Sequence, residues 1–79
     1  MNFNKAFEAL QAGMPIKREE WQGYWVLEDG KVIIHLKEGT DLNILDTDDV
    51  MFTLSHMGED DWEVASLSNC RRLREDREW

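Results

Sequence analysis

The single cysteine, Cys70, is the feature that most limits how this chain can fold. One cysteine allows neither an intrachain disulfide nor a cysteine-based zinc site, and these are the usual supports of very small domains. Two domains in a chain of 79 residues would each have roughly 40 residues, too few to fold without such supports. We therefore expect one hydrophobic core, whose modest size favours association between subunits.

Acidic residues dominate the charge: 17 Asp and Glu face 9 Lys and Arg, a net charge of −8. Binding to nucleic acid or to an anionic membrane favours the opposite sign. No apolar run approaches the ~20 residues of a membrane span, and the first residues have no apolar signal-peptide core. We predict a cytoplasmic protein that binds neither nucleic acid nor membrane.

The first residues show a helical pattern. Apolar side chains recur at i, i+3, i+4 and i+7, at Phe3, Ala6, Phe7 and Leu10. Asn2 or Asn4 can cap the helix, Gly13 can end it, and Pro15 prevents its continuation. These signals predict a helix over residues 3–12.

Short strands are predicted from Pro15 onward. Asp29-Gly30 is a hairpin signal, because a type I′ turn needs positive φ at both positions. Polar loops are expected at 46–49 and 56–60. The predicted strands are 15–18, 24–28, 31–37, 40–45, 50–55 and 61–65. This order predicts an α+β fold, with the helix packed on an antiparallel β-sheet meander.

The composition changes near Ala65. Residues 1–65 form the predicted ligand-binding domain, and residues 66–79 hold four of the arginines. This C-terminal segment is either a short helix packed on a neighbour or a frayed end. Within it, Arg71 and Glu75 have the spacing of a helical ion pair. We interpret Cys70 as a free thiol at the surface or at an interface.

A basic and aromatic cluster is the most informative segment. Its members are Arg18, Trp21, Gly23, Tyr24 and Trp25. An aromatic face can stack on a base, and an Arg fork can hold a phosphate. The alternative is that the two tryptophans are core residues and Arg18 is a solvated surface charge.

Residues from Met1 to about Ala65 resemble the second Thoeris anti-defence family of small phage proteins. That family opens with a helix, continues with Arg-x-x-Trp-x-Gly, and closes with Asp-Trp-Glu-Val. The matching positions are Phe3, Ala6, Phe7, Leu10 and Gly13, then Arg18, Trp21 and Gly23, then Asp61, Trp62, Glu63 and Val64.

The resemblance implies a sponge, which sequesters a cyclic nucleotide immune messenger without cleaving it. The messengers are mainly glycocyclic ADP-ribose forms, and some members bind cyclic oligonucleotides. It also implies a homo-oligomer, a dimer or tetramer, with pockets between subunits. For a phage-encoded protein, the location is the cytoplasm of the host cell.

The resemblance also assigns roles to residues. Trp21 is predicted to stack on a base, Arg18 to contact phosphate, and Gly23 to let backbone N–H groups approach the ligand. Asp61 is predicted to cap or to form a pair, and Trp62 to fill the core or an interface. Further candidates are Tyr24 and Trp25, by proximity, and Ser55 and His56, as loop donors to ribose hydroxyls.

No catalytic site is predicted, because no nucleophile, base and oxyanion donor come together. His35 and His56 have no cysteine near them, so we expect neither a metal site nor a cofactor. Two other functions stay open. One is an acidic inhibitor that mimics DNA charge and blocks a basic host protein. The other is a structural subunit that uses exposed sheet edges.

Overall fold

The computed structural model describes residues 1–47 and 50–77 and contains three α-helices, one 3-10 helix and five strands in those ranges. In chain order these are α1 (Phe3–Gln11), β1 (Ile16–Arg18), β2 (Tyr24–Glu28), β3 (Lys31–His35), β4 (Asp41–Asn43), η1 (Ile44–Asp46), α2 (Val50–Met57), β5 (Trp62–Val64) and α3 (Arg71–Arg77). Positions 48–49 of the predicted loop and 78–79 of the C-terminal segment lie outside the described residues.

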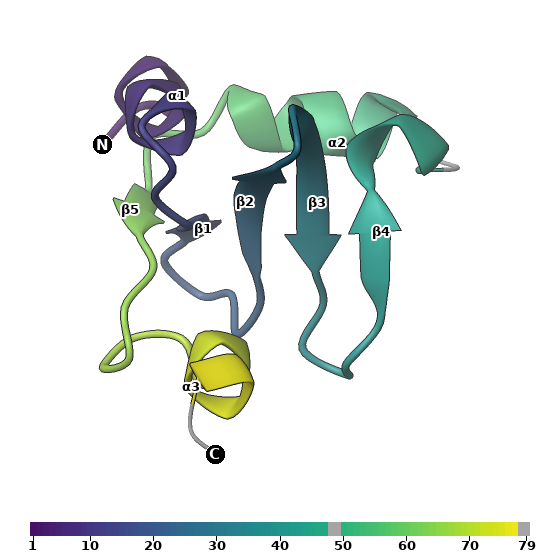
Figure 1. The fold of residues 1–79 in the computed structure, drawn as a ribbon. Coiled ribbons are helices and arrows are strands. Elements are labelled where there is room, and N and C mark those ends of the chain that lie inside the picture. The colour runs from purple at the N-terminus through teal and green to yellow at the C-terminus, as the bar shows by residue number, and fades with distance from the viewer. Residues whose placement is uncertain (48–49, 78–79) are drawn as a thin grey trace.

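The five strands form one antiparallel sheet in the order β4-β3-β2-β1-β5 (Figure 1). The predicted α+β class is therefore confirmed. Asp29 and Gly30 both have positive φ, 52° and 76°, as the predicted hairpin turn requires. β5 returns to the far edge and pairs with β1, where Arg18 lies opposite Trp62.

One face of the sheet carries an apolar row that crosses four strands. Ile16 lies opposite Trp25, Trp25 opposite Ile34, and Ile34 opposite Leu42. Helix α1 packs on the end of this face formed by β2, β1 and the edge strand β5. Its N-cap is Asn2, whose side chain accepts from the N–H of Lys5, and its buried residues belong to the core cluster Ala6, Leu10, Ile16, Trp25 and Trp62.

The prediction of a strand over 50–55 is wrong, because this segment lies in helix α2. A short apolar run does not separate strand from helix by periodicity. Thr53, His56 and Met57 are partly buried at helical spacing, whereas the apolar Met51 and Phe52 are exposed. Because apolar residues also occupy exposed positions, the helical period of the buried positions is not visible in the sequence. Figure 1 shows α2 running across β2, β3 and β4.

The C-terminal segment forms helix α3, which packs against the opposite face of the sheet. Cys70 is fully buried and donates from Sγ to the carbonyl oxygen of Gln22 at 3.3 Å, which corrects the prediction of a surface or interface thiol. Leu73 packs in the same cluster as Tyr24. The predicted pair of Arg71 and Glu75 forms on the outer side, with 3.5 Å between Nε and Oε1.

A polar network fastens α3 to β2 and β4. Arg72 donates to Asp41 at 2.6 Å and to Asp76 at 2.9 Å, and its Nη1 donates to the carbonyl oxygen of Leu36 at 2.7 Å. Tyr24 donates from its hydroxyl to Asp76 at 2.6 Å. Because Arg72 is buried, these acceptors offset the cost of removing its charge from water.

Tyr24 gives a spectroscopic readout of this network, since it is the only tyrosine. Burial, then the hydrogen bond and charge of Asp76, raise its pKa well above the ordinary value. We expect its phenolate absorbance to appear well above pH ~10. Tyr24 therefore stabilises the fold fully below its unfolded pKa, and this contribution is lost as pH rises through the folded pKa. Asp76→Asn is expected to move the transition down, though not fully, because burial remains; an ordinary tyrosine transition in the native protein would contradict the network.

Gly23 is required where β2 begins. A Cβ there would collide with the carbonyl oxygen of His35 and lie 3.3 Å from Cα of Leu36. We expect Gly23→Ala to lower the free energy of unfolding by about 2–4 kcal/mol, because backbone atoms must shift. Gly58→Ala is the matched control, since its Cβ would meet only the carbonyl oxygen of Ser55 at 3.7 Å. Urea denaturation measures both variants, and equal losses would contradict this account.

Candidate ligand-binding pocket

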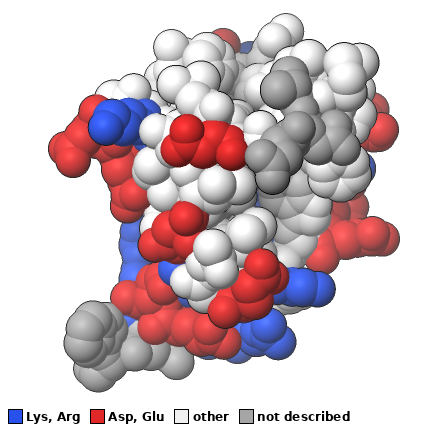
Figure 2. Space-filling view, turned by 90° about the vertical axis from the view of Figure 1, so that its right-hand side faces the viewer, with Lys and Arg blue, Asp and Glu red and all other residues white. Residues whose placement is uncertain are grey.

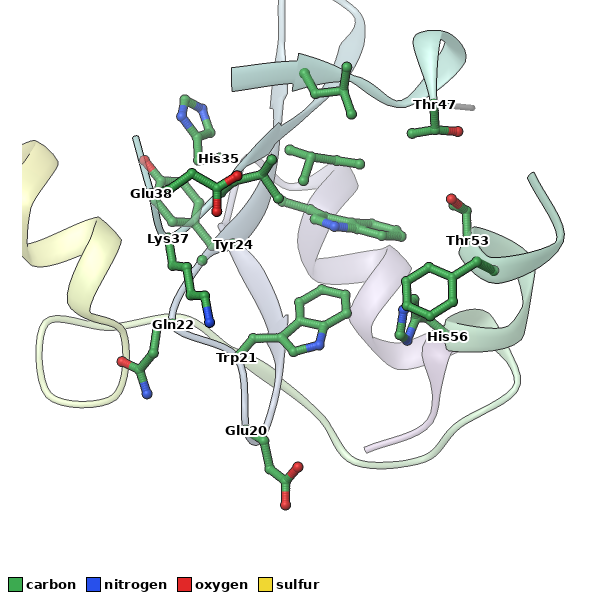
Figure 3. Close-up of a pocket in the computed structure, with 16 residues that line it drawn as sticks. Glu20, Trp21, Gln22, Tyr24, His35, Lys37, Glu38, Thr47, Thr53 and His56 are labelled. Carbon is green, nitrogen blue, oxygen red and sulfur yellow. The ribbon is translucent and has the colours of Figure 1, made fainter. Parts of the chain in front are cut away.

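A cavity of about 450 Å³ opens between the apolar row and helix α2 (Figure 3). Trp25, Ile34 and Leu42 form its floor, because they are consecutive members of the row. Phe52, Thr53 and His56 line it from α2. The volume falls in the range of about 300–1,000 Å³ that is usual for small-molecule sites.

Trp21 is the aromatic wall of this pocket. It lies in the turn between β1 and β2, where its backbone N–H donates to the carbonyl oxygen of Arg18 at 3.0 Å. Its ring centroid is 5.7 Å from that of Trp25, and it meets Trp62 and His56 edge-on at 5.2 and 5.0 Å. The ring is therefore held on one side and remains partly exposed toward the cavity.

The rim of the pocket carries three charged groups, Glu20, Lys37 and Glu38. Figure 3 shows Lys37 extending toward Trp21. Among the described residues that line the cavity, Lys37 is the one Lys or Arg. An anionic part of a ligand therefore has one lysine to approach at this rim.

Arg18 does not line the pocket. Its guanidinium makes two bonds to the carboxylate of Asp61, 2.8 Å from Nε and 3.1 Å from Nη2. The hydrogen bond and charge of Arg18 outweigh desolvation and lower the pKa of Asp61. Nη1 lies 2.8 Å from Nδ1 of His56. The predicted pairing of Asp61 is confirmed, and Arg18 is already occupied by partners from this chain.

The other sequence-predicted residues divide between the pocket and its surroundings. Gly23, Trp25 and His56 line the cavity, and His56 lies in α2 rather than in a loop. Tyr24 borders it, but its hydroxyl turns to Asp76 at the α3 face. Ser55 is outside the lining and donates to the carbonyl oxygen of Phe52 at 2.6 Å.

Sequence reasoning missed much of the lining. Ile34 and Leu42 follow from Trp25 once the register is known, because residues opposite one another share a face. Phe52 and Thr53 needed the helical assignment of α2. Lys37 carries no local signal, since a single lysine near a turn is ordinary.

Within residues 1–47 and 50–77, no three His, Cys, Asp or Glu side chains are grouped so that they could hold a metal ion. No helix in the described part of the chain has the length and hydropathy of a bilayer span. No protein-family model, curated protein or solved structure matches this chain.

Proposed function

We propose that this protein is a non-catalytic binding protein that sequesters a cyclic nucleotide messenger of the glycocyclic ADP-ribose class. The observation that carries the proposal is the cavity walled by Trp21 over the floor of Trp25 and Ile34. A base can bury its apolar surface there and stack on an indole. The sequence resemblance to anti-defence sponges supplies the ligand class.

The charged part of such a ligand belongs at the rim. Arg18 is held by Asp61, so its release for a phosphate would leave that carboxylate unpaired. Lys37 carries no such bond among the described contacts and extends toward Trp21 (Figure 3). We therefore propose Lys37, in place of Arg18, as the phosphate contact.

We further propose a homo-oligomer in the cytoplasm, of the host cell if the protein is phage-encoded. Helix α2 exposes Met51, Phe52 and Leu54, with Phe52 61% exposed beside the cavity. A second copy that covers these side chains would bury apolar surface and narrow the opening of the pocket. The number of ligands bound per chain reports whether pockets are shared.

The acidic-inhibitor alternative has less support from the surface. Figure 2 shows acidic groups next to basic groups on the face that it presents. Asp61 is paired with Arg18, and Asp41 and Asp76 are paired with Arg72. A DNA mimic needs unpaired carboxylates in a row, so these pairs reduce the available charge.

Isothermal titration with glycocyclic ADP-ribose isomers, cyclic ADP-ribose and cyclic di- and trinucleotides tests the proposal. We expect one class to bind tightly and to be recovered intact after heat denaturation. Trp21→Ala is expected to weaken binding by about 100-fold, because stacking contributes ~1–3 kcal/mol per base. Leu67→Ala is the control, since Leu67 is exposed outside the pocket. No binding, with capture of a basic protein instead, would favour the inhibitor.

Lys37 and Arg18 separate the two phosphate assignments. Lys37→Ala is expected to weaken binding of the phosphorylated ligand by about 5- to 10-fold, because one charge-assisted contact is lost. Binding of adenosine, which has no phosphate, should be unchanged. Lys31→Ala controls for the change in net charge, since Lys31 is exposed outside the lining. A loss in Arg18→Gln that affects the phosphorylated ligand but not adenosine, in a variant that remains folded and with Lys37→Ala unchanged, would restore Arg18 as the contact.

A further inference from the structure

His56 lines the pocket from helix α2, whereas the sequence analysis predicted a loop at this position. Its ring meets Trp21 at 85° with 5.0 Å between centroids, and meets Phe52 at 85° with 4.5 Å. Figure 3 shows it beside Trp21 at the wall of the cavity. These two ring contacts fix the plane of the imidazole, so its nitrogens have defined directions.

The state of the ring follows from its partner at Nδ1. Arg18 has only N–H donors, so Nδ1, 2.8 Å from Nη1, must act as the acceptor. A neutral imidazole that accepts at Nδ1 carries its proton at Nε2. The Asp61 carboxylate holds Arg18 in this orientation through two bonds.

The charges around His56 favour the same neutral form. Desolvation and the Arg18 charge lower its pKa, against smaller effects of Asp61 and Glu59. These three groups come from β1 and the segment before β5. At neutral pH the ring is therefore uncharged and has one proton to donate.

We propose that Nε2–H of His56 is a fixed hydrogen-bond donor to the ligand, and that Arg18 is a positioning residue acting through His56. No acceptor for Nε2 is found among the described residues. The ligand group that fits is an uncharged acceptor on a flat ring, a ring nitrogen of the base, lying beside Trp21. This inference rests on the proposed function for its ligand, but the state of His56 is independent of it.

Nitrogen-15 NMR of the free protein tests the state of the ring. We expect His56 at neutral pH to be uncharged, with its proton on Nε2. The two histidines are told apart with His56→Gln. In Arg18→Gln, the midpoint of the His56 titration is expected to rise, because a neighbouring positive charge is lost and Asp61 is uncompensated. A proton on Nδ1, a charged ring at neutral pH, or an unchanged midpoint would overturn the positioning role.

Ligand analogues test the donor itself. Titration compares adenosine with 1-deaza-, 3-deaza- and 7-deazaadenosine, which lack the ring acceptors N1, N3 and N7 in turn. With the wild-type chain, one analogue is expected to bind about 5- to 10-fold more weakly than adenosine. His56→Phe should bind all four equally, whereas His56→Gln, which keeps a donor, should retain part of the difference. Equal binding of the four by the wild type would overturn the donor.

The two arms fail separately. If adenosine and the cyclic nucleotides all fail to bind, the proposed function falls and NMR alone decides the state of His56. If they bind without discrimination, the proposed function stands and the donor falls. His56→Phe retains the backbone carbonyl that accepts from Nε1 of Trp62 at 2.9 Å, so we expect it to remain folded, and circular dichroism and the urea midpoint test this.

Discussion

Trp62 is the residue on which the construction of the pocket depends. It is 1% exposed, and its ring contacts those of Phe3, Trp21 and Trp25. Its Nε1–H donates to the carbonyl oxygen of His56 at 2.9 Å, so one side chain joins α1, the sheet and α2. Its backbone also exchanges bonds with Met1, whose amino group donates to the Trp62 carbonyl at 2.8 Å. The pairing of β5 with β1 therefore holds Trp62 where it contacts both walls of the cavity.

The two faces of the sheet differ in what they bury: one buries apolar side chains, and the other also buries charged ones. The face below α1 and α2 is apolar and leaves part of its row uncovered, and this uncovered part is the pocket floor. The opposite face buries the cations Lys17 and Arg72. Nζ of Lys17 lies 3.5 Å from Oε2 of Glu63, and the guanidinium of Arg72 pairs with the carboxylates of Asp41 and Asp76. Pairing of this kind is needed because a buried unpaired charge costs several kcal/mol. Several carboxylates behind the net charge of −8 are thus engaged in holding the fold together.

Local patterns were sufficient for the parts of the fold that depend on local chemistry. Helix α1 follows from its spacing and cap, and the β2–β3 turn follows from Asp29-Gly30, because backbone conformation there is set by neighbouring residues. Helix α2 was missed because polar Thr53 and His56 are partly buried, while its apolar Met51 and Phe52 are largely exposed. The burial of Cys70 depends on the approach of α3 to Gln22, 48 positions earlier. Contacts of this range leave no trace in local periodicity.

The partners of Arg18 also come from distant positions in the sequence, so local patterns could not identify them. Its spacing to Trp21 is equally suited to holding a phosphate or to bracing the turn that presents the indole. What distinguishes the two is Asp61, 43 positions away, whose carboxylate matches the guanidinium fork. Arg18 lies outside the pocket lining, where its bond to His56 holds the imidazole beside Trp21 but offers little charge to the cavity. For the proposed nucleotide, selectivity would then come chiefly from the base, through stacking and one directed donor, while the phosphate meets a single lysine at an otherwise acidic rim. Recognition that relies on the base suits a protein of net negative charge, because stacking and a neutral hydrogen-bond donor do not depend on the sign of the protein's charge.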